Sequence, residues 1–361
     1  MKLTLVAGAR PNFIKIAPII RAIEKSNLQG SNIQYRLVHT GQHYDDALSL
    51  SFFKDLNIPE PNINLGAGSG SQSEQTASIM VAFERELVSH SPNAVVVVGD
   101  VNSTLACSIV AKKLCIDVVH IEAGIRSGDR SMPEEINRLV TDSISDHFFT
   151  TTREAGSNLI KAGISEKKIH FVGNTMIDSL IQSKDRFSPP SVTKLYNLKK
   201  GKYIVLTLHR PANVDSIEKL QEVINSITKG AMPTPIVFPV HPRTKKNLKA
   251  IKLIPELVTT DPMRYLEFMY LIKHSKGVVT DSGGIQEETT YLGIPCLTLR
   301  NTTERPETVS VGTNELIGSL PEKIAEFVKK LVSGEWKKGR IPELWDGKTS
   351  DRIIAKLLEL Y

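Results

Sequence analysis

The sequence predicts an α/β protein built from two doubly wound, Rossmann-like domains that face a cleft. Short β-rich runs alternate with helix-length segments along the chain. Several runs are almost entirely apolar, such as AVVVV at 94–98, which is typical of parallel strands covered by helices on both faces. A polar segment with two adjacent prolines, 184–202, interrupts this alternation and is typical of a domain linker. Ligands of such sheets bind beyond the carboxyl ends of the strands.

One series of strands precedes the polar segment and a second series follows it. Each strand is followed by a stretch long enough for a helix, so right-handed βαβ units are expected in both halves. The predicted strands are 3–7, 34–39, 94–98, 118–121 and 147–150 in the first half, and 203–208, 235–240, 277–280 and 295–299 in the second.

Composition excludes several classes of function. Lys and Arg exceed Asp and Glu by only 45 − 39 = 6. Clusters such as Lys245, Lys246 and Lys249 are therefore expected to be solvated helix faces, and no nucleic-acid partner is predicted. The absence of a run of 18 apolar residues argues against a membrane span or membrane partner.

The cysteines and the N-terminus indicate the compartment. Cys107, Cys115 and Cys296 lack metal-ligand spacing and cannot all pair, so they are expected to be buried thiols of a reducing compartment. The segment MKLTLVAGARPNFIK does not fit a signal peptide, because Arg10 and Pro11 interrupt it early. The expected location is the cytoplasm.

The stretch TDSGGIQEE, residues 280–288, follows an apolar strand and has two interpretations. Gly283 and Gly284 are typical of a tight turn, with Glu287 and Glu288 as solvated helix residues. Alternatively, the glycines open a helix whose unpaired N–H groups bind an anion that no side chain blocks.

Ionisable residues follow nearly every predicted strand, where the edge of a parallel sheet would gather them. The first half supplies the acids Asp100, Glu122 and Glu134, which suit proton transfer. Each also has a structural interpretation: Asp100 as a helix N-cap, for example, and Glu134 as a first-turn carboxylate beside a proline. Basic residues suited to a diphosphate are Arg10, Lys15, His209, Arg210 and Arg305.

This division of charge predicts a site for an activated sugar or similar nucleotide-linked group. The acids lack a clustered metal-binding pattern, so no metal is expected. The dinucleotide fingerprint G-x-G-x-x-G is absent after the first strand, which argues against a dinucleotide, and no cofactor is predicted.

Ten motifs in order over almost the whole chain resemble the non-hydrolysing UDP-N-acetylglucosamine 2-epimerases. They are GARPNFIK, TGQHYD, GD-x-x-ST, HIEAG-x-RS, MPEEINR, GNT-x-ID, LHR, HPRT, TDSGGIQEE and TTERPE. The resemblance implies the glycosyltransferase-B arrangement, with an N-terminal domain 1–183 completed by the C-terminal helix 347–361, and a UDP-binding domain 184–346. It also implies a homodimer.

The family's site residues map onto this sequence position by position. By resemblance, the catalytic residues are Asp100, Glu122, Glu134, Arg138 and His209, with His209 also near the diphosphate. The UDP-binding residues are Arg10, Lys15, Phe268, Ser282, Gly283, Gly284, Glu288 and Arg305. Within this set, the N–H groups at 282–284 hold the diphosphate, Glu288 accepts from the ribose, and Phe268 lies against the uracil.

The implied activity interconverts UDP-GlcNAc and UDP-ManNAc for surface polysaccharide precursors, by UDP elimination through a 2-acetamidoglucal and re-addition. Three departures put the sugar in doubt: Asn12 and Ala212 stand where the family often has Glu, and Val101 where Thr is common. GARPNFIK and MPEEINR are closer to relatives that epimerise UDP-2,3-diacetamido uronic acids. A hydrolysing epimerase, a glycosyltransferase and a non-catalytic nucleotide-sugar sensor remain alternatives.

Overall fold

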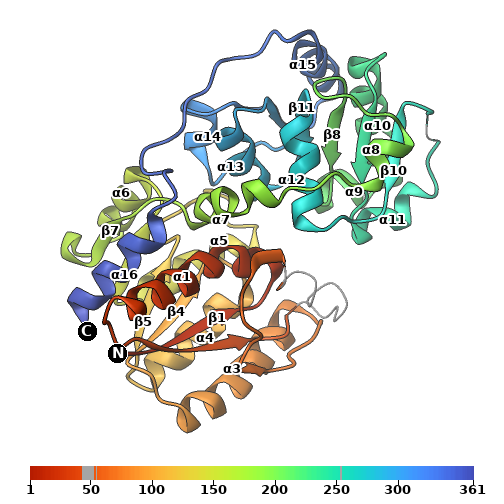
Figure 1. Ribbon diagram of the computed structural model, residues 1–361. Helices are drawn as coiled ribbons and strands as arrows, with labels where there is room; N and C mark the ends of the chain where they lie inside the picture. Colours follow the sequence, from red (N-terminus) through yellow and green to blue (C-terminus); the bar gives the residue numbers. More distant parts are fainter. Residues whose placement is uncertain (43–52, 54, 253) are drawn as a thin grey trace. The chain divides into compact units, whose positions relative to one another are not determined.

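The computed structural model describes residues 1–42, 53, 55–252 and 254–361, and the chain divides into two compact units. Unit 1 comprises Met1–Gln182 and Glu343–Tyr361, and unit 2 comprises Ser183–Pro342. Both ends of the chain therefore belong to unit 1 (Figure 1).

The sheet of unit 1 has seven strands in the order β3-β2-β1-β4-β5-β6-β7, and all of its neighbouring strands are parallel. The central strand β4 is buried at all of its residues, as a strand covered on both faces must be. The strands are β1 Lys2–Ala7, β2 Gln34–His39, β3 Ile63–Asn64, β4 Ala94–Val98, β5 Asp117–Ile121, β6 His147–Thr150 and β7 Ile169–Phe171.

Helices follow these strands, and the last helix of the chain completes the unit. They are α1 Arg10–Leu28, α3 Gln72–Ser89, α4 Asn102–Lys113, α5 Pro133–Ile144, α6 Arg153–Lys161, α7 Thr175–Ser183 and α16 Thr349–Leu360. Helix α16, in blue, packs beside α1, in red, although the two lie at opposite ends of the sequence (Figure 1). The carboxylate of Asp178 on α7 holds the start of α16, because it accepts from the N–H groups of Thr349 and Ser350.

Unit 2 contains a six-stranded sheet in the order β10-β9-β8-β11-β12-β13, again with parallel neighbours. Its strands are β8 Ile204–Thr207, β9 Ile236–Pro239, β10 Leu257–Thr260, β11 Gly277–Thr280, β12 Cys296–Thr298 and β13 Asn314–Leu316. Its helices are α8 Ser191–Leu195, α9 Pro211–Val214, α10 Ile217–Ala231, α11 Pro242–Leu248, α12 Tyr265–His274, α13 Gly283–Leu292, α14 Pro306–Ser310 and α15 Pro321–Ser333.

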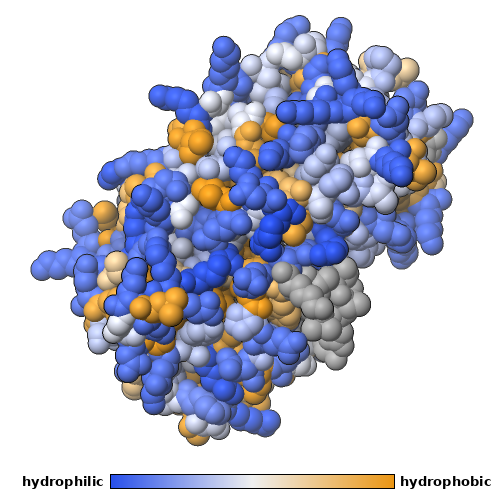
Figure 2. All heavy atoms as spheres, in the orientation of Figure 1, coloured by the Kyte–Doolittle hydropathy of each residue, from blue (hydrophilic) through white to orange (hydrophobic). Residues whose placement is uncertain are grey.

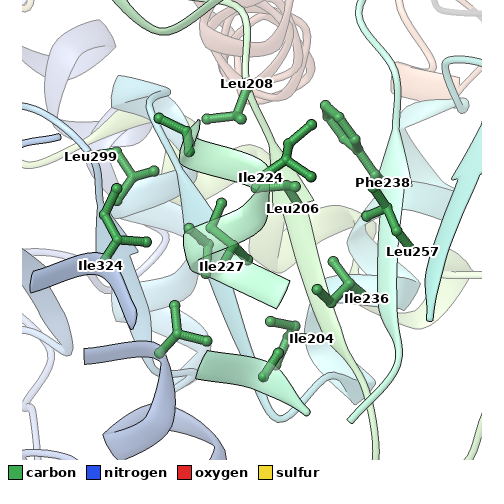
Figure 3. Packing of buried hydrophobic residues seen from close by; sticks show 14 of the residues in the cluster. Ile204, Leu206, Leu208, Ile224, Ile227, Ile236, Phe238, Leu257, Leu299 and Ile324 are labelled. Atoms are coloured by element: carbon green, nitrogen blue, oxygen red, sulfur yellow. The ribbon is translucent and has the colours of Figure 1, made fainter. Parts of the chain in front are cut away.

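The core of unit 2 lies between the sheet and helices α10 and α15. Ile204 and Leu206 of β8 and Ile224 and Ile227 of α10 point into one apolar cluster (Figure 3). Full burial of each such side chain stabilises the fold by about 1.5–3 kcal/mol. This packing fixes the strand ends on which the polar residues of unit 2 are mounted.

All nine predicted strands are confirmed, but four strands were not predicted. These are β3, β7, β10 and β13, the outermost strands of the two sheets. They are two to four residues long and carry polar residues, as in Asn314–Leu316 (NEL), so they lack the apolar run that reveals a central strand. The segment 184–202, expected to be a linker, contains the short helix α8 and belongs entirely to unit 2.

The expectation that all three cysteines are buried is wrong for one of them, and the exposure of the lysine cluster and the membrane expectation can also be compared with the structure. Cys115 is exposed, because it follows the end of α4 in a left-handed turn with φ of 56°, whereas Cys107 and Cys296 are buried. Lys245, Lys246 and Lys249 are exposed. On the face shown in Figure 2, hydrophobic residues form small separate patches among hydrophilic ones. Within the described ranges, no helix has the length and apolar character needed to cross a membrane.

Candidate functional site

The site residues of unit 1 gather where the strand order reverses, at the carboxyl ends of β1 and β4. Ligands of doubly wound sheets bind at this position. Gly99 directly follows β4 with φ of +70°, a conformation that glycine adopts without strain. A Cβ atom at Gly99 would lie 3.3 Å from Lys15 Nζ and 3.5 Å from Glu122 Oε2. These two charged side chains therefore converge on the bare backbone of Gly99.

Lys15 and Glu122 form a buried ion pair above Gly99. Lys15 comes from the first turns of α1, and Glu122 follows β5 directly. Glu122 has φ of +68°, a left-handed conformation that costs a residue with a side chain about 1–2 kcal/mol. Strain of this kind persists where the surrounding structure imposes it, and it concentrates at functional sites.

Asn12, one of the departures from the family pattern, organises the same strand end. Its Oδ1 accepts from the N–H of Ala9 at 2.9 Å, and its Nδ2 donates to the Val98 carbonyl at 3.0 Å. The amide thus ties the end of β1 to the end of β4. A glutamate lacks the donor for the second bond.

Asp100 is held by helix α5. Its carboxylate forms an ion pair with Arg138, and its backbone carbonyl accepts from Asn137 Nδ2 at 2.9 Å. The N-cap of α4 is Val101, so the interpretation of Asp100 as that cap is wrong. Arg138 also donates to Glu135 Oε2 at 2.8 Å, so the guanidinium is fixed from two sides.

Glu135, which follows the predicted catalytic acid Glu134, has a different environment from its neighbour. Glu135 is buried and accepts from the N–H groups of Ser127 and Gly128. Burial opposes its ionisation, but the hydrogen bonds from Ser127, Arg138 and Gly128 outweigh that effect and lower its pKa. Glu134 is partly exposed in the first turn of α5, as its position after Pro133 predicts.

In unit 2, a buried carboxylate positions the predicted histidine. Asp281 follows β11 and accepts from the backbone N–H groups of His209 and Arg210. The Nδ1 atom of His209 lies 2.8 Å from Asp281 Oδ1. Burial opposes ionisation of Asp281, but these interactions with His209 and Arg210, with a bond from Asn213, lower its pKa. His209 is thereby fixed at the end of β8, beside the start of α13.

The glycines of TDSGGIQEE form the first turn of α13, as predicted, and the side chain before them does not cap the helix. Ser282 is the N-cap and makes no side-chain cap bond, and the Asp281 carboxylate turns toward His209 instead. A Cβ atom at Gly283 would lie 2.6 Å from Glu304 Oε1. Ser282, Gly283 and Gly284 are all partly exposed, so this helix start is accessible.

Gln286 ties the loop containing TTERPE to α13. Its Oε1 accepts from Thr303 Oγ1 at 2.7 Å and from Asn314 Nδ2 at 3.0 Å. In the same loop, Arg305 Nε lies 2.8 Å from Glu287 Oε1, and both side chains are buried. Glu287 is therefore not the solvated helix residue of the structural interpretation.

Glu288 is buried on the same helix, one turn beyond the glycines. It accepts from the Tyr265 hydroxyl at 3.0 Å. Burial raises the pKa of Glu288 to about 8, with a further rise from the charge of Glu287 and an opposing effect of the Tyr265 bond. Phe268 is partly exposed on α12, the helix that supplies Tyr265.

The predicted residues thus fall into two groups. Asp100, Glu122, Arg138 and Lys15 are brought together in unit 1, where Arg10 is exposed at the start of α1. His209, Ser282, Gly283 and Gly284 lie at the adjacent ends of β8 and β11 in unit 2. Residues 43–45 of TGQHYD lie outside the described residues. Among the residues that the structure describes, no group of three or more His, Cys, Asp or Glu is placed to hold a metal ion.

Sequence reasoning missed the buried polar residues that hold these groups in place. They are Glu135, Asn137, Asp281 as the partner of His209, and Gln286. They could have been found from their positions in the sequence, because they lie in the motifs MPEEINR and TDSGGIQEE beside the predicted site residues. A buried polar side chain needs a partner, and a motif with several polar residues supplies several such partners.

Comparison with known proteins identifies relatives that match almost the whole chain. A family model described as UDP-N-acetylglucosamine 2-epimerase matches residues 26–358. The UDP-N-acetylglucosamine 2-epimerase of Methanocaldococcus jannaschii is 43% identical over 370 residues, covering 99% of both chains. Its crystal structure with UDP-GlcNAc and UDP has a TM-score of 0.89, with 42% identity over 99% of this chain and 100% of that one.

A second kind of relative matches the sequence of the whole chain. The UDP-2,3-diacetamido-2,3-dideoxy-D-glucuronate 2-epimerase of Pseudomonas aeruginosa is 38% identical over 363 residues, covering 100% of both chains. The match of the family model across most of the sequence, and relatives above 30% identity over its full length, establish the family. The chain belongs to the UDP-N-acetylglucosamine 2-epimerase family.

Proposed function

We propose that this protein interconverts UDP-GlcNAc and UDP-ManNAc without net hydrolysis. The observation that carries the proposal is the cluster at the switch point of unit 1, where Asp100 and Glu122 are each paired with a cation, Arg138 and Lys15. A glycosyltransferase or a nucleotide-sugar sensor needs no such pair of fixed carboxylates. The names and crystal ligands of the relatives support the same substrate.

The chemistry explains why two or more carboxylates are needed. The C2 hydrogen of an acetamido sugar is not next to a carbonyl carbon, so enolisation cannot remove it. A base takes the C2 proton, the C–H electron pair forms the C1=C2 bond, and UDP leaves with the electrons of the C1–O bond. Protonation of the resulting 2-acetamidoglucal on the other face, with re-addition of UDP to C1, gives the C2 epimer.

We assign the proton transfers to Asp100, Glu122 and Glu134. Two faces of the sugar must be served, so at least two of these groups act on C2 or on the leaving oxygen. Each positioned acid or base typically contributes about 10²–10⁴-fold to the rate. Arg138 holds Asp100, and Lys15 holds Glu122, so both carboxylates are fixed before substrate arrives.

UDP binding is assigned to a separate set of residues. In unit 2, the partly exposed start of α13 at Ser282, Gly283 and Gly284 suits a diphosphate, since helix N-termini bind anions. The N–H of Ser282 donates to Thr280 Oγ1 at 3.0 Å, so a diphosphate there would replace or share this bond. Arg305 and His209 supply positive charge, Glu288 a ribose acceptor and Phe268 a face for the uracil. Arg10 and Lys15 of unit 1 are assigned to phosphate contacts. The fixed position of His209 beside Asp281 supports this assignment.

A second substrate is favoured by a specific observation. Asn12 places a neutral amide where many family members have a carboxylate, and the relative from Pseudomonas aeruginosa acts by its name on a diacetamido uronic acid. Loss of a negative charge beside Lys15 would suit an acidic sugar. UDP-2,3-diacetamido uronic acid is therefore the alternative substrate, and the reaction at C2 would be the same.

The cellular setting belongs to the same proposal. Three unpaired cysteines suit the reducing cytoplasm. We place the reaction there, as a step toward surface polysaccharide precursors. We also propose that the active form is a homodimer.

The test is incubation with UDP-GlcNAc in D₂O, with C2 followed by NMR. Deuterium at C2 of an intact UDP-sugar, together with UDP-ManNAc, is the expected result. Free sugar with UDP would instead identify a hydrolysing epimerase. No exchange with UDP-GlcNAc, but exchange with the diacetamido uronic acid, would transfer the function to that substrate. Absence of exchange with both would leave a transferase or a sensor.

A further inference from the structure

We infer that His120 and Asp142 are positioning residues. They hold the three segments of unit 1 that carry Asp100, Glu122 and Glu134 in fixed positions relative to one another. This inference rests on the proposed function, because it assigns a role in the same proton transfers. Neither residue belongs to the predicted site. We call the pair the His120–Asp142 clamp.

His120 links the second of these segments to the first. It lies on β5, two residues before Glu122, and its side chain is fully buried. Its Nε2 atom is 2.9 Å from the carbonyl oxygen of Gly99, the residue that precedes Asp100. The imidazole therefore sets the position of the loop that carries Asp100. The same residue, Gly99, is the one on which Lys15 and Glu122 converge.

Asp142 links the same histidine to the third segment. It lies on α5, the helix that also carries Glu134 and Arg138. Its Oδ1 is 2.7 Å from His120 Nδ1, and its Oδ2 accepts from the N–H of Gly124 at 3.1 Å. The second bond fixes the turn in which Glu122 is held at a positive φ.

The clamp residues are surrounded by hydrogen-bonding partners. A carbonyl oxygen and an ionised carboxylate only accept hydrogen bonds, so each ring nitrogen of His120 faces an acceptor. Arg126 Nη1 also donates to Asp142 Oδ2, at 2.6 Å. Burial opposes ionisation of Asp142, but the charges and hydrogen bonds of His120 and Arg126 lower its pKa. The result is a buried network of charge-assisted bonds, which are stronger than neutral ones.

A clamp of this kind affects the rate more than binding. Misplacement of a reacting group by about 1 Å can cost roughly 10²-fold in rate. The hydrogen bonds of the clamp to Gly99, Gly124 and Arg126 all lie within unit 1, whereas the UDP contacts are assigned mostly to unit 2. Its loss is therefore expected to lower kcat and to leave UDP affinity unchanged.

The experiment compares three variants of the full-length protein: His120→Asn, Asp142→Asn and the double variant. We expect each single change to lower kcat for C2 deuterium exchange about 10²-fold, with KM changed less than about threefold. Because both residues act through one clamp, the double variant should lose no more than about threefold beyond the worse single one. His170→Asn is the matched control: His170 is a half-buried histidine of the same sheet, packed 5.1 Å from the Phe149 ring. It should keep its kcat.

The outcomes separate this inference from the proposed function. If the wild type shows no C2 exchange with either UDP-sugar, the proposed function fails. If the wild type exchanges and the single variants do so at its rate, or if their losses multiply in the double variant, the clamp is overturned. If His120→Asn does not fold, Arg126→Gln tests the clamp instead, because it removes the guanidinium that donates to Asp142 Oδ2. An unchanged kcat in that folded variant would also contradict the clamp.

Discussion

Gly283 lies in the first turn of α13, where an added methyl group would meet the carboxylate of Glu304. That carboxylate is paired with Arg300 at 2.7 Å, and it is the far end of a flexible side chain. The methyl group would also occupy the space from which an anion reaches the helix N–H groups. Alanine is thus expected to disturb the ligand more than the fold.

We predict that Gly283→Ala weakens UDP binding roughly tenfold or more, about 1.4 kcal/mol. Gly293→Ala, at the other end of the same helix, is the matched control. Gly293 has φ of +69°, so alanine there should cost about 1 kcal/mol of unfolding free energy and leave UDP affinity unchanged. Calorimetry with UDP and chemical denaturation of both variants check this. If the Gly283→Ala protein binds UDP as tightly as the wild type, the glycines serve the tight turn and not the ligand.

The positions of the charged site residues were easier to predict from the sequence than the residues that hold them. Asp100, Glu122 and His209 follow apolar strands, so their positions could be inferred from the order of a parallel sheet. The partner of His209, Asp281, is 72 residues away, and the amide that holds the Asp100 carbonyl is 37 residues away. Contacts over such separations depend on packing, which one sequence does not display.

Among the secondary-structure elements, α16 shows how the end of the chain is secured. The Asp178 carboxylate accepts from the N–H groups of Thr349 and Ser350 and from the Ser350 hydroxyl at 2.8 Å. It is buried at a helix N-terminus, where negative charge is favourable. The motif GNT-x-ID therefore has a structural role in joining α7 to α16.

We predict that Asp178→Ala lowers the free energy of unfolding by about 1–3 kcal/mol, since it leaves buried N–H groups without an acceptor. Asp351→Ala is the control on the same helix: Asp351 is half exposed and pairs with exposed Lys25, so the change should stay within about 0.5 kcal/mol. Urea unfolding of both variants measures the difference. Equal stabilities would show that α16 is held by its apolar face alone.

The elements that sequence reasoning missed share one physical property. Central strands are covered on both faces and need continuous apolar residues, whereas the outermost strands β3, β7, β10 and β13 pair along one edge. They can be short and polar, as Ile63–Asn64 is. The central architecture was therefore predictable, and the extent of each sheet was not.

At the scale of the whole molecule, the two units repeat one plan with different chemistry. Apart from the additional strand β7, both sheets follow the same order, and in both some predicted residues closely follow the strands where that order reverses: Asp100 in unit 1, and His209 and Ser282 in unit 2. Unit 1 places carboxylates there, paired with Lys15 and Arg138. Unit 2 places an accessible helix start there, with His209 beside it. We thus assign proton transfer to unit 1 and most of the UDP contacts to unit 2.

The most direct test of this division is the rate of C2 deuterium exchange by Asp100→Asn at saturating UDP-GlcNAc, with UDP affinity measured on the same sample. We predict that exchange falls by at least about 10²-fold and that UDP affinity is unchanged. Arg305→Ala gives the converse reference, with UDP binding weakened by about 1.5–3 kcal/mol, the range for hydrogen bonds to charged groups. Exchange by Asp100→Asn at the wild-type rate, or a loss confined to UDP affinity, would contradict the assignment of proton transfer to unit 1.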